Sequence, residues 1–343
     1  MTTNSQRTTL ATIASVAGVS VATVSKVVNG RPHVSPTTRA IVESLLDEHA
    51  YVARRLETSR FPSVELVFQG PLTAYSLEIL QGVVNEGGDL SVDVVVTLRP
   101  RNWRGSGTNF SQWVRQFAAA GRQAVIAVVS ELSAAELAAV ARLRLPIVVI
   151  DPINMPRSRI VSVGSTNFTG GFTATQHLLD LGHRRIAYIG GTATAACNRA
   201  RMHGYRSAME AAGAPIAESY VRNGEFRYSD GVSEGAALLS LDQPPTAIFA
   251  ANDETALGVL EAARTHGLRV PEDLSVVGFD DTEVARVASP ALTAVAQPLR
   301  RMGAVALRTA LRLAAGERVD SHHVELATEL VVRDSTAPPP DAD

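Results

Sequence analysis

The stretch TLATIASVAGVSVATVSKVVN (residues 9–29) decides the fold of the amino-terminal part of this chain. Apolar and small residues recur at helical spacing in its first half: Leu10, Ile13, Ala14 and Ala17. Gly18 ends this helix, and Ser20 is a suitable N-cap for a second helix over 21–29 that buries Val24. Small residues let the two helices cross closely, so the spacing A-x-x-A-G-V-S predicts a helix-turn-helix. A third helix is expected to begin at Ser35.

The outer face of the second helix has the composition of a DNA-contact surface. Its expected exposed residues are Val21, Ala22, Thr23, Ser25, Lys26 and Asn29. Early positions on a recognition helix meet base edges, whereas hydroxyl and amide groups meet phosphates. Lys26 is the only lysine of the chain, and its amine can donate to guanine, while Val21 and Ala22 can touch thymine methyl groups. The alternative interpretation is a three-helix bundle with a solvated polar face.

The charge distribution agrees with a separate anion-binding module at the amino terminus. The whole chain has a formal net charge of -2. Residues 1–60 carry seven basic and four acidic side chains, so the head is basic and the remainder acidic. A difference of this size also arises by chance, and it therefore supports the helix-turn-helix only as a second observation.

Beyond a polar break at 58–63, apolar strand-like runs alternate with amphipathic helical segments. The expected strands are 64–68, 92–97, 124–129, 146–150, 186–190, 246–251 and 274–279. This alternation predicts parallel sheets covered by helices, and the lack of polar alternation within the strands indicates that both sheet faces are buried. Because 343 residues are too many for one ordinary domain, we expect an all-α head followed by two α/β lobes, each a doubly wound parallel sheet.

Several classes of protein are disfavoured. Cys197 is the only cysteine, so neither an internal disulfide nor a cysteine zinc cluster can form. No dinucleotide or phosphate-binding glycine motif and no H-E-x-x-H is present, which disfavours the main rival, an α/β enzyme. We expect no catalytic residue, no metal and no cofactor. The amino terminus lacks a signal-peptide core, and no apolar run approaches the ~18 residues of a membrane span, so we expect a cytoplasmic location and no membrane partner.

The helix-turn-helix and the following VARRL (52–56) resemble the head and hinge helix of the lactose/galactose-repressor (LacI) family. The base contacts that this resemblance implies are Val21, Ala22 and Lys26. The phosphate or operator contacts that it implies are Thr23, Ser25, Asn29, His33 and Thr38. It also implies that Leu56, beside Ala53, wedges into the minor groove and kinks the operator.

The resemblance continues through most of the chain, for example in LGHRRIAYIGG (181–191) and GLRVPEDLSVVGFDD (267–281). It implies a periplasmic-binding-protein fold with three chain crossovers and a ligand cleft at the carboxyl ends of the strands. The implied effector-binding residues are Tyr75, Ser76, Asp151, Arg201, Phe226, Asn252, Asp253, Asp280 and Gln297. The alternatives are structural salt bridges for Arg201 and Asp280, helix capping by the Asn-Asp pair, and core packing of the aromatic residues.

These observations lead to the expectation of a repressor whose operator affinity is controlled by a small ligand, a sugar or an oligosaccharide. The expected units are a head (1–50), a hinge helix and linker (51–63), an effector domain (64–337) and a disordered tail (338–343). The expected N-lobe comprises 64–161 and 294–325, and the expected C-lobe comprises 162–293 and 326–337. A homodimer is expected to bind a pseudo-palindromic operator. Whether the effector releases DNA or favours its binding stays open, and a ligand-binding module without DNA activity is disfavoured by the intact head.

The chain departs from the family pattern in three places. Ser76 stands where relatives often carry an aromatic residue, and Thr166 stands where many carry aspartate. Between Tyr51 and Val52 roughly four residues are missing, and four extended residues span ~13 Å. We expect the end of the third helix, near 47–51, to unwind so that Leu56 still reaches the operator.

Overall fold

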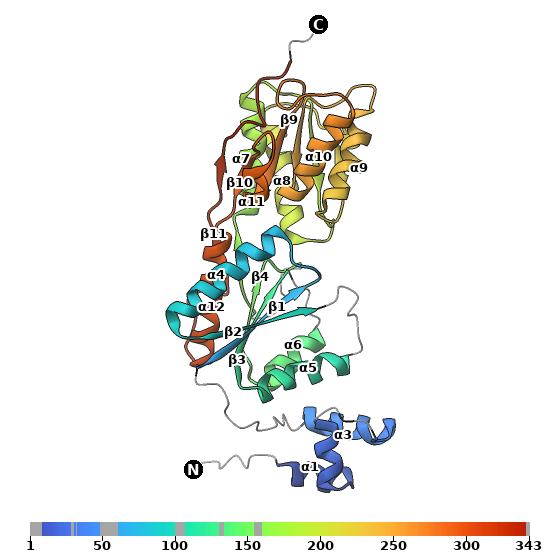
Figure 1. Cartoon of the computed structure of the whole chain (residues 1–343), viewed down its shortest axis with the longest axis vertical. Coiled ribbons are helices and arrows are strands. Elements are labelled where there is room, and N and C mark those ends of the chain that lie inside the picture. The colour runs from blue at the N-terminus through green and yellow to red at the C-terminus, as the bar shows by residue number, and fades with distance from the viewer. Residues whose placement is uncertain are drawn as a thin grey trace.

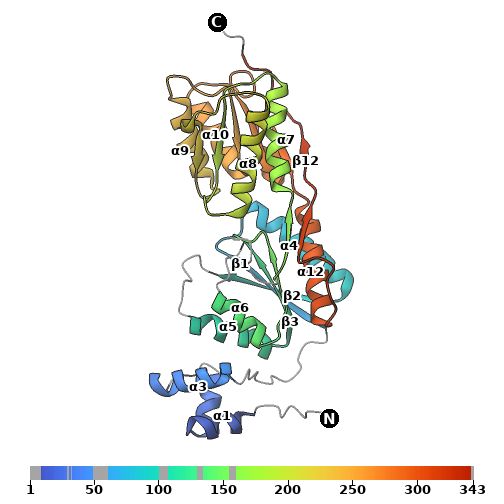
Figure 2. The ribbon, with the colours of Figure 1, turned by 180° about the vertical axis from the view of Figure 1, so that it is seen from behind.

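The computed structural model describes residues 9–28, 31, 33–48, 61–99, 107–129, 134–153 and 160–340. A small helical head, a first α/β lobe (the N-lobe) and a second α/β lobe (the C-lobe) follow one another along the long axis of the molecule (Figure 1). Seen from behind, α12 lies in the lobe next to the head although it comes late in the chain (Figure 2). The predicted order of an all-α head and two α/β lobes is confirmed.

Three helices form the head: α1 (Leu10–Ala17), α2 (Val21–Val28) and α3 (Pro36–Glu48). Gly18, at a φ of 64°, ends α1 in the left-handed region, where glycine carries no steric penalty. The hydroxyl oxygens of Ser20 and Ser35 each accept a hydrogen bond, at 3.1 Å, from the amide groups of Thr23 and Thr38 respectively. Both predicted N-caps are therefore present, and they fix where α2 and α3 begin.

No single helix of the described residues is long and apolar enough to cross a membrane. One bent pair, α1 with α2 at 109°, passes by length and composition only. Its apolar residues Ile13, Val24 and Val27 are buried in the core of the head together with Val42 and Leu46.

The N-lobe is built on a six-stranded sheet of order β11-β5-β4-β3-β1-β2, in which every strand pair is parallel. Its strands are β1 (Ser63–Gln69), β2 (Asp93–Arg99), β3 (Arg122–Val128), β4 (Ile147–Ile150), β5 (Val161–Ser165) and β11 (His323–Leu326). Helices α4 (Ala74–Leu90) and α12 (Leu299–Ala314) cover one face around Leu66 and Met302. Helices α5 (Gly107–Ala119) and α6 (Ala134–Arg142) cover the other around Val67.

The expectation that both faces of every strand are buried is wrong for β2. This strand is the last of its sheet, and Val96 and Leu98 are 40% and 53% exposed. An edge strand lacks the neighbour and part of the helical cover that bury a central strand, so its apolar composition leaves apolar surface in solvent.

The C-lobe is built on a second six-stranded sheet of order β12-β10-β9-β8-β6-β7. Its strands are β6 (Ile186–Gly190), β7 (Val221–Asn223), β8 (Ala247–Ala250), β9 (Ser275–Asp280), β10 (Thr293–Ala296) and β12 (Glu329–Val331). All its pairs are parallel except β10 with β12, so the expected wholly parallel sheet has one antiparallel edge. Its helices are α7 (Asn167–Asp180), α8 (Ala196–Ala211), α9 (Tyr228–Leu239), α10 (Asp253–Thr265) and the short α11 (Glu283–Val287).

The chain passes between the lobes after β5, after β10 and after β11. The expected lobe boundaries after 161, 293 and 325 fall within these strands, which end at Ser165, Ala296 and Leu326. Strands of four or five residues carry little pattern of their own, because the same residues also fit a loop. The assignment of residues to domains therefore stays an interpretation.

Pairs of helices cross at reciprocal glycines. A Cβ at any of these positions would overlap backbone of the partner helix: Gly82 and Gly303 between α4 and α12, Gly171 and Gly204 between α7 and α8, Gly231 and Gly258 between α9 and α10. Gly171 lies directly against the backbone of Arg201. The close crossing of α7 and α8 therefore sets the position of this arginine.

Candidate functional site

The free face of α2 carries the residues predicted to contact DNA. Val21, Ala22 and Lys26 are exposed, and 47% of the surface of Val21 faces solvent. Thr23 and Ser25 are half-buried. The helix thus presents a small apolar group and one cation at the positions that a major groove would meet, and the base contacts themselves stay a prediction.

The structure says less about the other residues that were predicted to contact DNA. His33 is exposed with a φ of 74°, and Thr38 is half-buried at the start of α3, where its hydroxyl accepts from Ser35 at 2.7 Å. Asn29, Ala53 and Leu56 lie outside the described residues. The prediction about the hinge helix therefore rests on the sequence. Helix α3 continues to Glu48, so the unwinding expected near 47–51 is not found at residues 47 and 48, and residues 49–51 lie outside the described part of the chain.

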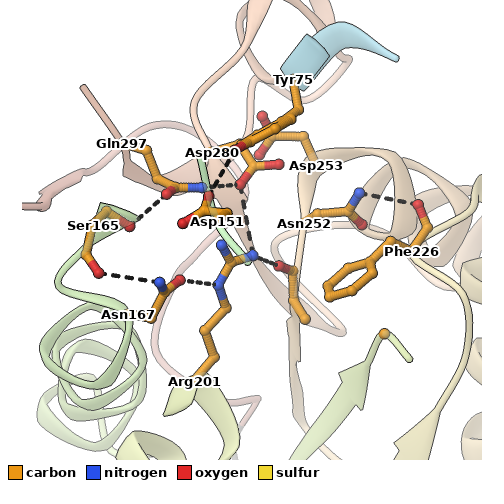
Figure 3. A network of polar contacts seen from close by, with 12 residues as sticks. Tyr75, Asp151, Ser165, Asn167, Arg201, Phe226, Asn252, Asp253, Asp280 and Gln297 are labelled. Carbon is orange, nitrogen blue, oxygen red and sulfur yellow. Dashed lines mark hydrogen bonds and ion pairs between the residues drawn. The ribbon is translucent and has the colours of Figure 1, made fainter. Parts of the chain in front are cut away.

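Polar side chains, most of them buried, form a cluster where the two lobes meet (Figure 3). We call the following residues the interlobe cluster: Tyr75, Asp151, Ser165, Asn167, Arg201, Asp280 and Gln297. Tyr75 and Asp151 come from α4 and the end of β4 in the N-lobe, and Arg201 comes from α8 of the C-lobe. Asp280 ends β9, while the others lie at the first two crossovers. Five of the predicted effector residues are thus brought together from both lobes, and carboxyl ends of parallel strands supply the two aspartates.

The guanidinium group of Arg201, only 3% exposed, is held on its edge and on its face. Its Nε donates to Asn167 Oδ1 at 2.8 Å, and its Nη1 donates to the carbonyl of Ala251 at 2.5 Å. Nη1 also lies 3.6 Å from Oδ1 of Asp280. The group stacks 3.7 Å from the ring centre of Phe279, a cation–π contact. Burial opposes the charge, but Asp280 and other neighbouring groups outweigh it and raise the pKa of Arg201.

Asp280 is held from the other side by an amide. Nε2 of Gln297 donates to Asp280 Oδ1 at 2.6 Å, and Oε1 of Gln297 accepts from the hydroxyl of Ser165 at 2.5 Å. Burial raises the pKa of Asp280 to about 7, against the opposing effects of Arg201 and of the amide of Gln297. The carboxyl group can therefore gain or lose a proton near neutral pH.

A second carboxyl group lies on the N-lobe side of the cluster. The phenol of Tyr75 donates to Asp151 Oδ2 at 2.6 Å. Burial raises the pKa of Asp151, although this hydrogen bond and the charge of Arg201 act in the opposite direction. Burial and the nearby Asp151 carboxylate raise the pKa of Tyr75, so the phenol stays a neutral donor.

Three of the predicted effector residues have left-handed backbone conformations. Their φ angles are 43° for Asp151, 62° for Phe226 and 109° for Asp280. Residues other than glycine rarely adopt such angles, and those that do concentrate at functional sites, where the surrounding fold enforces them. The local sequence does not favour these angles, so tertiary contacts must hold the side chains in place.

Phe226 and Asn252 form a separate pair beside the cluster. The ring of Phe226 lies where a side chain on Gly191 would be, and its carbonyl accepts from Nδ2 of Asn252 at 3.1 Å. Oδ1 of Asn252 accepts from the amide of Thr255 at 3.0 Å, so the residue caps α10. Helix capping, the alternative considered for Asn252, is thus observed, and its ligand contact stays a prediction.

The side chains of Asp253 and Ser76 form hydrogen bonds with neighbouring backbone and hydroxyl groups. Oδ2 of Asp253 accepts from the amide and the hydroxyl of Thr282, at 2.7 and 2.9 Å, and the residue is 1% exposed. The hydroxyl of Ser76 lies 3.1 Å from that of Thr73, which caps α4. Neither residue has a hydrogen bond to the interlobe cluster, and their roles toward a ligand remain predictions.

Three residues of this region were not predicted from the sequence. Ser165 and Asn167 flank the first crossover, and Nδ2 of Asn167 donates to the carbonyl of Ser165 at 3.1 Å. Cys197 is close enough for Arg201, Asp151 and Asp280 to influence its ionisation, and burial raises its pKa to about 11. In the sequence, Ser165 and Asn167 flank Thr166, and Cys197 precedes Arg201. These positions were the only available signal, and they do not distinguish a site residue from a loop residue.

One hydrogen-bond donor and one acceptor of the interlobe cluster have no partner among the described residues. Within the described residues, neither Nη2 of Arg201 nor Oδ2 of Asp280 forms a hydrogen bond. A hydroxyl group of a ligand can accept from the one and donate to the other. No group of three or more histidine, cysteine, aspartate or glutamate residues in the described part of the chain could hold a metal ion.

Comparisons with known proteins cover nearly the whole chain. Residues 9–53 match the model of bacterial regulatory proteins of the lacI family, and residues 175–336 match a periplasmic-binding-protein-like domain. The HTH-type transcriptional regulator DegA of Bacillus subtilis is 35% identical over 336 residues, 97% of this chain and 99% of its own.

Two solved structures are similar over nearly the same length. The transcriptional regulator CelR in complex with cellobiose has a TM-score of 0.73 and 33% identity, and the match covers 96% of this chain and 100% of CelR. The lac repressor dimer bound to operator and the anti-inducer ONPF has a TM-score of 0.71 and 28% identity, with 97% and 100% coverage.

Proposed function

Since the chain belongs to the LacI family of bacterial transcriptional regulators, we propose that an uncharged sugar binds the interlobe cluster and thereby changes the affinity of the head for operator DNA. The observation that carries the proposal is the buried Arg201–Asp280 pair with its free Nη2 and Oδ2. Adjacent hydroxyl groups of a sugar both donate and accept, so one sugar edge satisfies both atoms at once. The relatives are transcriptional regulators and not enzymes, and CelR was solved with cellobiose.

The charge of the cluster supports an uncharged ligand. Two aspartates, Asp151 and Asp280, face one arginine, Arg201, and Asp253 adds a further buried carboxyl group close to Asp280. Burial raises the pKa of all three carboxyl groups, and the one cation of the cluster, Arg201, is already paired with Asp280 at 3.6 Å. A phosphate or carboxylate on the ligand would have to compete with this carboxyl group for the arginine. The ring of Phe226 supplies an apolar surface on which a sugar face can stack.

We further propose that the chain acts as a homodimer. Helix α4 packs beside β2, and both expose large apolar side chains: Leu77, Val84, Val96 and Leu98. The same surface of a second copy of this chain would cover these side chains. The similar lac repressor, which was solved as a dimer on its operator, supports this arrangement. Two heads related by a twofold axis would read a pseudo-palindromic operator.

The remaining assignments follow from these proposals. The DNA contacts are Val21, Ala22, Thr23, Ser25, Lys26, Asn29, His33, Thr38, Ala53 and Leu56. The head is 1–50, the hinge 51–63, the effector domain 64–337 and the tail 338–343. We propose a cytoplasmic location, because the head must have access to operator DNA. Effector and operator are linked because a ligand that prefers one lobe arrangement shifts the population of that arrangement.

A thermal-shift screen of sugars, with cellobiose first, followed by titration calorimetry, tests the effector site. A sugar that binds the folded chain raises its Tm. Arg201→Met should abolish the shift. Arg264→Met, which removes an exposed arginine paired with Glu261 at 2.7 Å, should leave it unchanged. Unaltered sugar affinity in Arg201→Met would contradict the site assignment.

A further inference from the structure

The polar contacts around the Arg201–Asp280 pair close into a ring that includes two crossovers. Ser165 Oγ donates to Gln297 Oε1, and Gln297 Nε2 donates to Asp280 Oδ1. The carboxylate faces Arg201, whose Nε donates to Asn167 Oδ1. Nδ2 of Asn167 completes the ring by donating to the carbonyl of Ser165. All five residues and their contacts are visible in Figure 3.

Hydrogen-bond direction fixes the orientation of Gln297. Its Nε2 donates to Oδ1 of Asp280 and its Oε1 accepts from the hydroxyl of Ser165, which is the arrangement that ionised Asp280 requires. The backbone amide of Gln297 also donates to the carbonyl of Asp280 at 3.2 Å. Gln297 thus uses both ends of its side-chain amide inside the protein, although the sequence predicted it as a ligand contact.

The position of these residues in the chain gives the ring a second property. Ser165 is the last residue of β5 in the N-lobe sheet, directly before the first crossover. Gln297 follows β10 of the C-lobe sheet and precedes α12 of the N-lobe, so it lies in the second crossover. Ser165 and Gln297 are 1% and 6% exposed. A change at the carboxylate therefore reaches two of the three connections between the lobes through buried contacts with few alternative partners.

From this geometry we infer that Ser165 and Gln297 are positioning residues, which hold the Asp280 carboxylate for the effector and couple its occupancy to the crossovers between the lobes. The inference rests on the proposed function, because it concerns the same site. A positioning residue and a ligand contact differ in the measured property that a substitution changes. A ligand contact sets the affinity for the effector, whereas a positioning residue also sets how strongly the effector changes operator binding.

A double-mutant cycle without any ligand tests the ring itself. Ser165 and Asp280 are joined through Gln297, so the Tm shifts of Ser165→Ala and Asp280→Asn should be non-additive by roughly 2 °C or more. Ser162→Ala removes another buried hydroxyl of β5, one that contacts His323 on β11 at 2.8 Å, and should be additive with Asp280→Asn. Additive shifts for Ser165→Ala would overturn the inference.

A second measurement uses cellobiose as the probe and fluorescence anisotropy of labelled operator DNA as the readout. Ser165→Ala and the equally long, apolar Gln297→Met should retain cellobiose binding within about tenfold but reduce its effect on operator affinity at least fivefold. Ser162→Ala should respond like the unaltered chain. Loss of sugar affinity with a full operator response at saturation would make Gln297 a ligand contact and overturn the inference. Should cellobiose fail to bind the unaltered chain, the proposed use of this sugar would be wrong, and the ligand-free cycle would still decide the role of the ring.

Discussion

Replacement of Asp280 by asparagine should remove a large pH dependence of stability. Burial raises the pKa of this carboxyl group from 3.8 to about 7 in the folded chain. Between these values the folded chain holds a proton that the unfolded chain has lost. The favourable contribution is complete below pH 3.8 and disappears as the pH rises through 7. Asparagine keeps the shape and the acceptor oxygen but cannot ionise.

The size of this pH dependence follows from the pKa shift of Asp280. One pKa unit corresponds to about 1.4 kcal/mol, so the free energy of unfolding should fall by about 3 kcal/mol between pH 5 and pH 8 through this group alone. Urea unfolding of the unaltered chain and of Asp280→Asn across this range gives the difference. His177 and His183, whose pKa values burial lowers, contribute to both proteins and largely cancel. Burial and the neighbouring Asp280 raise the pKa of Asp253, so its contribution changes with the substitution and forms part of the measured difference.

Asp273→Asn provides the matched control. This half-buried carboxylate pairs with Arg269 at 2.9 Å, and that pairing lowers its pKa, so the substitution should not change the slope between pH 5 and pH 8. A constant difference between the unaltered chain and Asp280→Asn would show that Asp280 is ionised throughout. The argument that desolvation outweighs Arg201 at this site would then be refuted.

Further outcomes follow for the sugar, the DNA and the dimer. Cellobiose affinity should rise about tenfold from pH 6 to pH 8, because sugar hydroxyl groups donate best to ionised Asp280, and a flat profile in calorimetry would contradict this. Lys26→Ala should cost ~1–3 kcal/mol at one operator position, measured with single-base operator variants; an equal loss on all sequences would indicate a phosphate contact instead. Leu56→Ala should weaken operator binding by at least ~1 kcal/mol and reduce bending in a circular-permutation gel, and no change in either would mean that the shortened hinge does not insert. Leu98→Asp should weaken dimerisation by about 2 kcal/mol or more in sedimentation equilibrium, and an unchanged dimer would place the interface elsewhere.

Local patterns were sufficient for the head and for strands that are apolar throughout. The helix-turn-helix was predicted with its caps at Ser20 and Ser35, because capping and helical periodicity act between residues three or four positions apart. Strand 186–190 was predicted with its observed bounds, because a fully buried parallel strand is a short apolar run. The resemblance to the LacI family implied that Asp151 and Asp280 lie together, and each follows such a run.

The rest depended on contacts between distant parts of the chain. Strands β5, β10, β11 and β12 are short and gain their definition only from their neighbours in the sheets. The hydrogen bond between Ser165 and Gln297 joins residues 132 positions apart, and the left-handed backbone of Asp280 is held by its surroundings. Sequence determined which elements form, because their caps and apolar faces are local properties. Tertiary structure alone decided which buried polar groups meet, because a desolvated hydroxyl, amide or carboxylate takes its partner from whatever the fold places beside it.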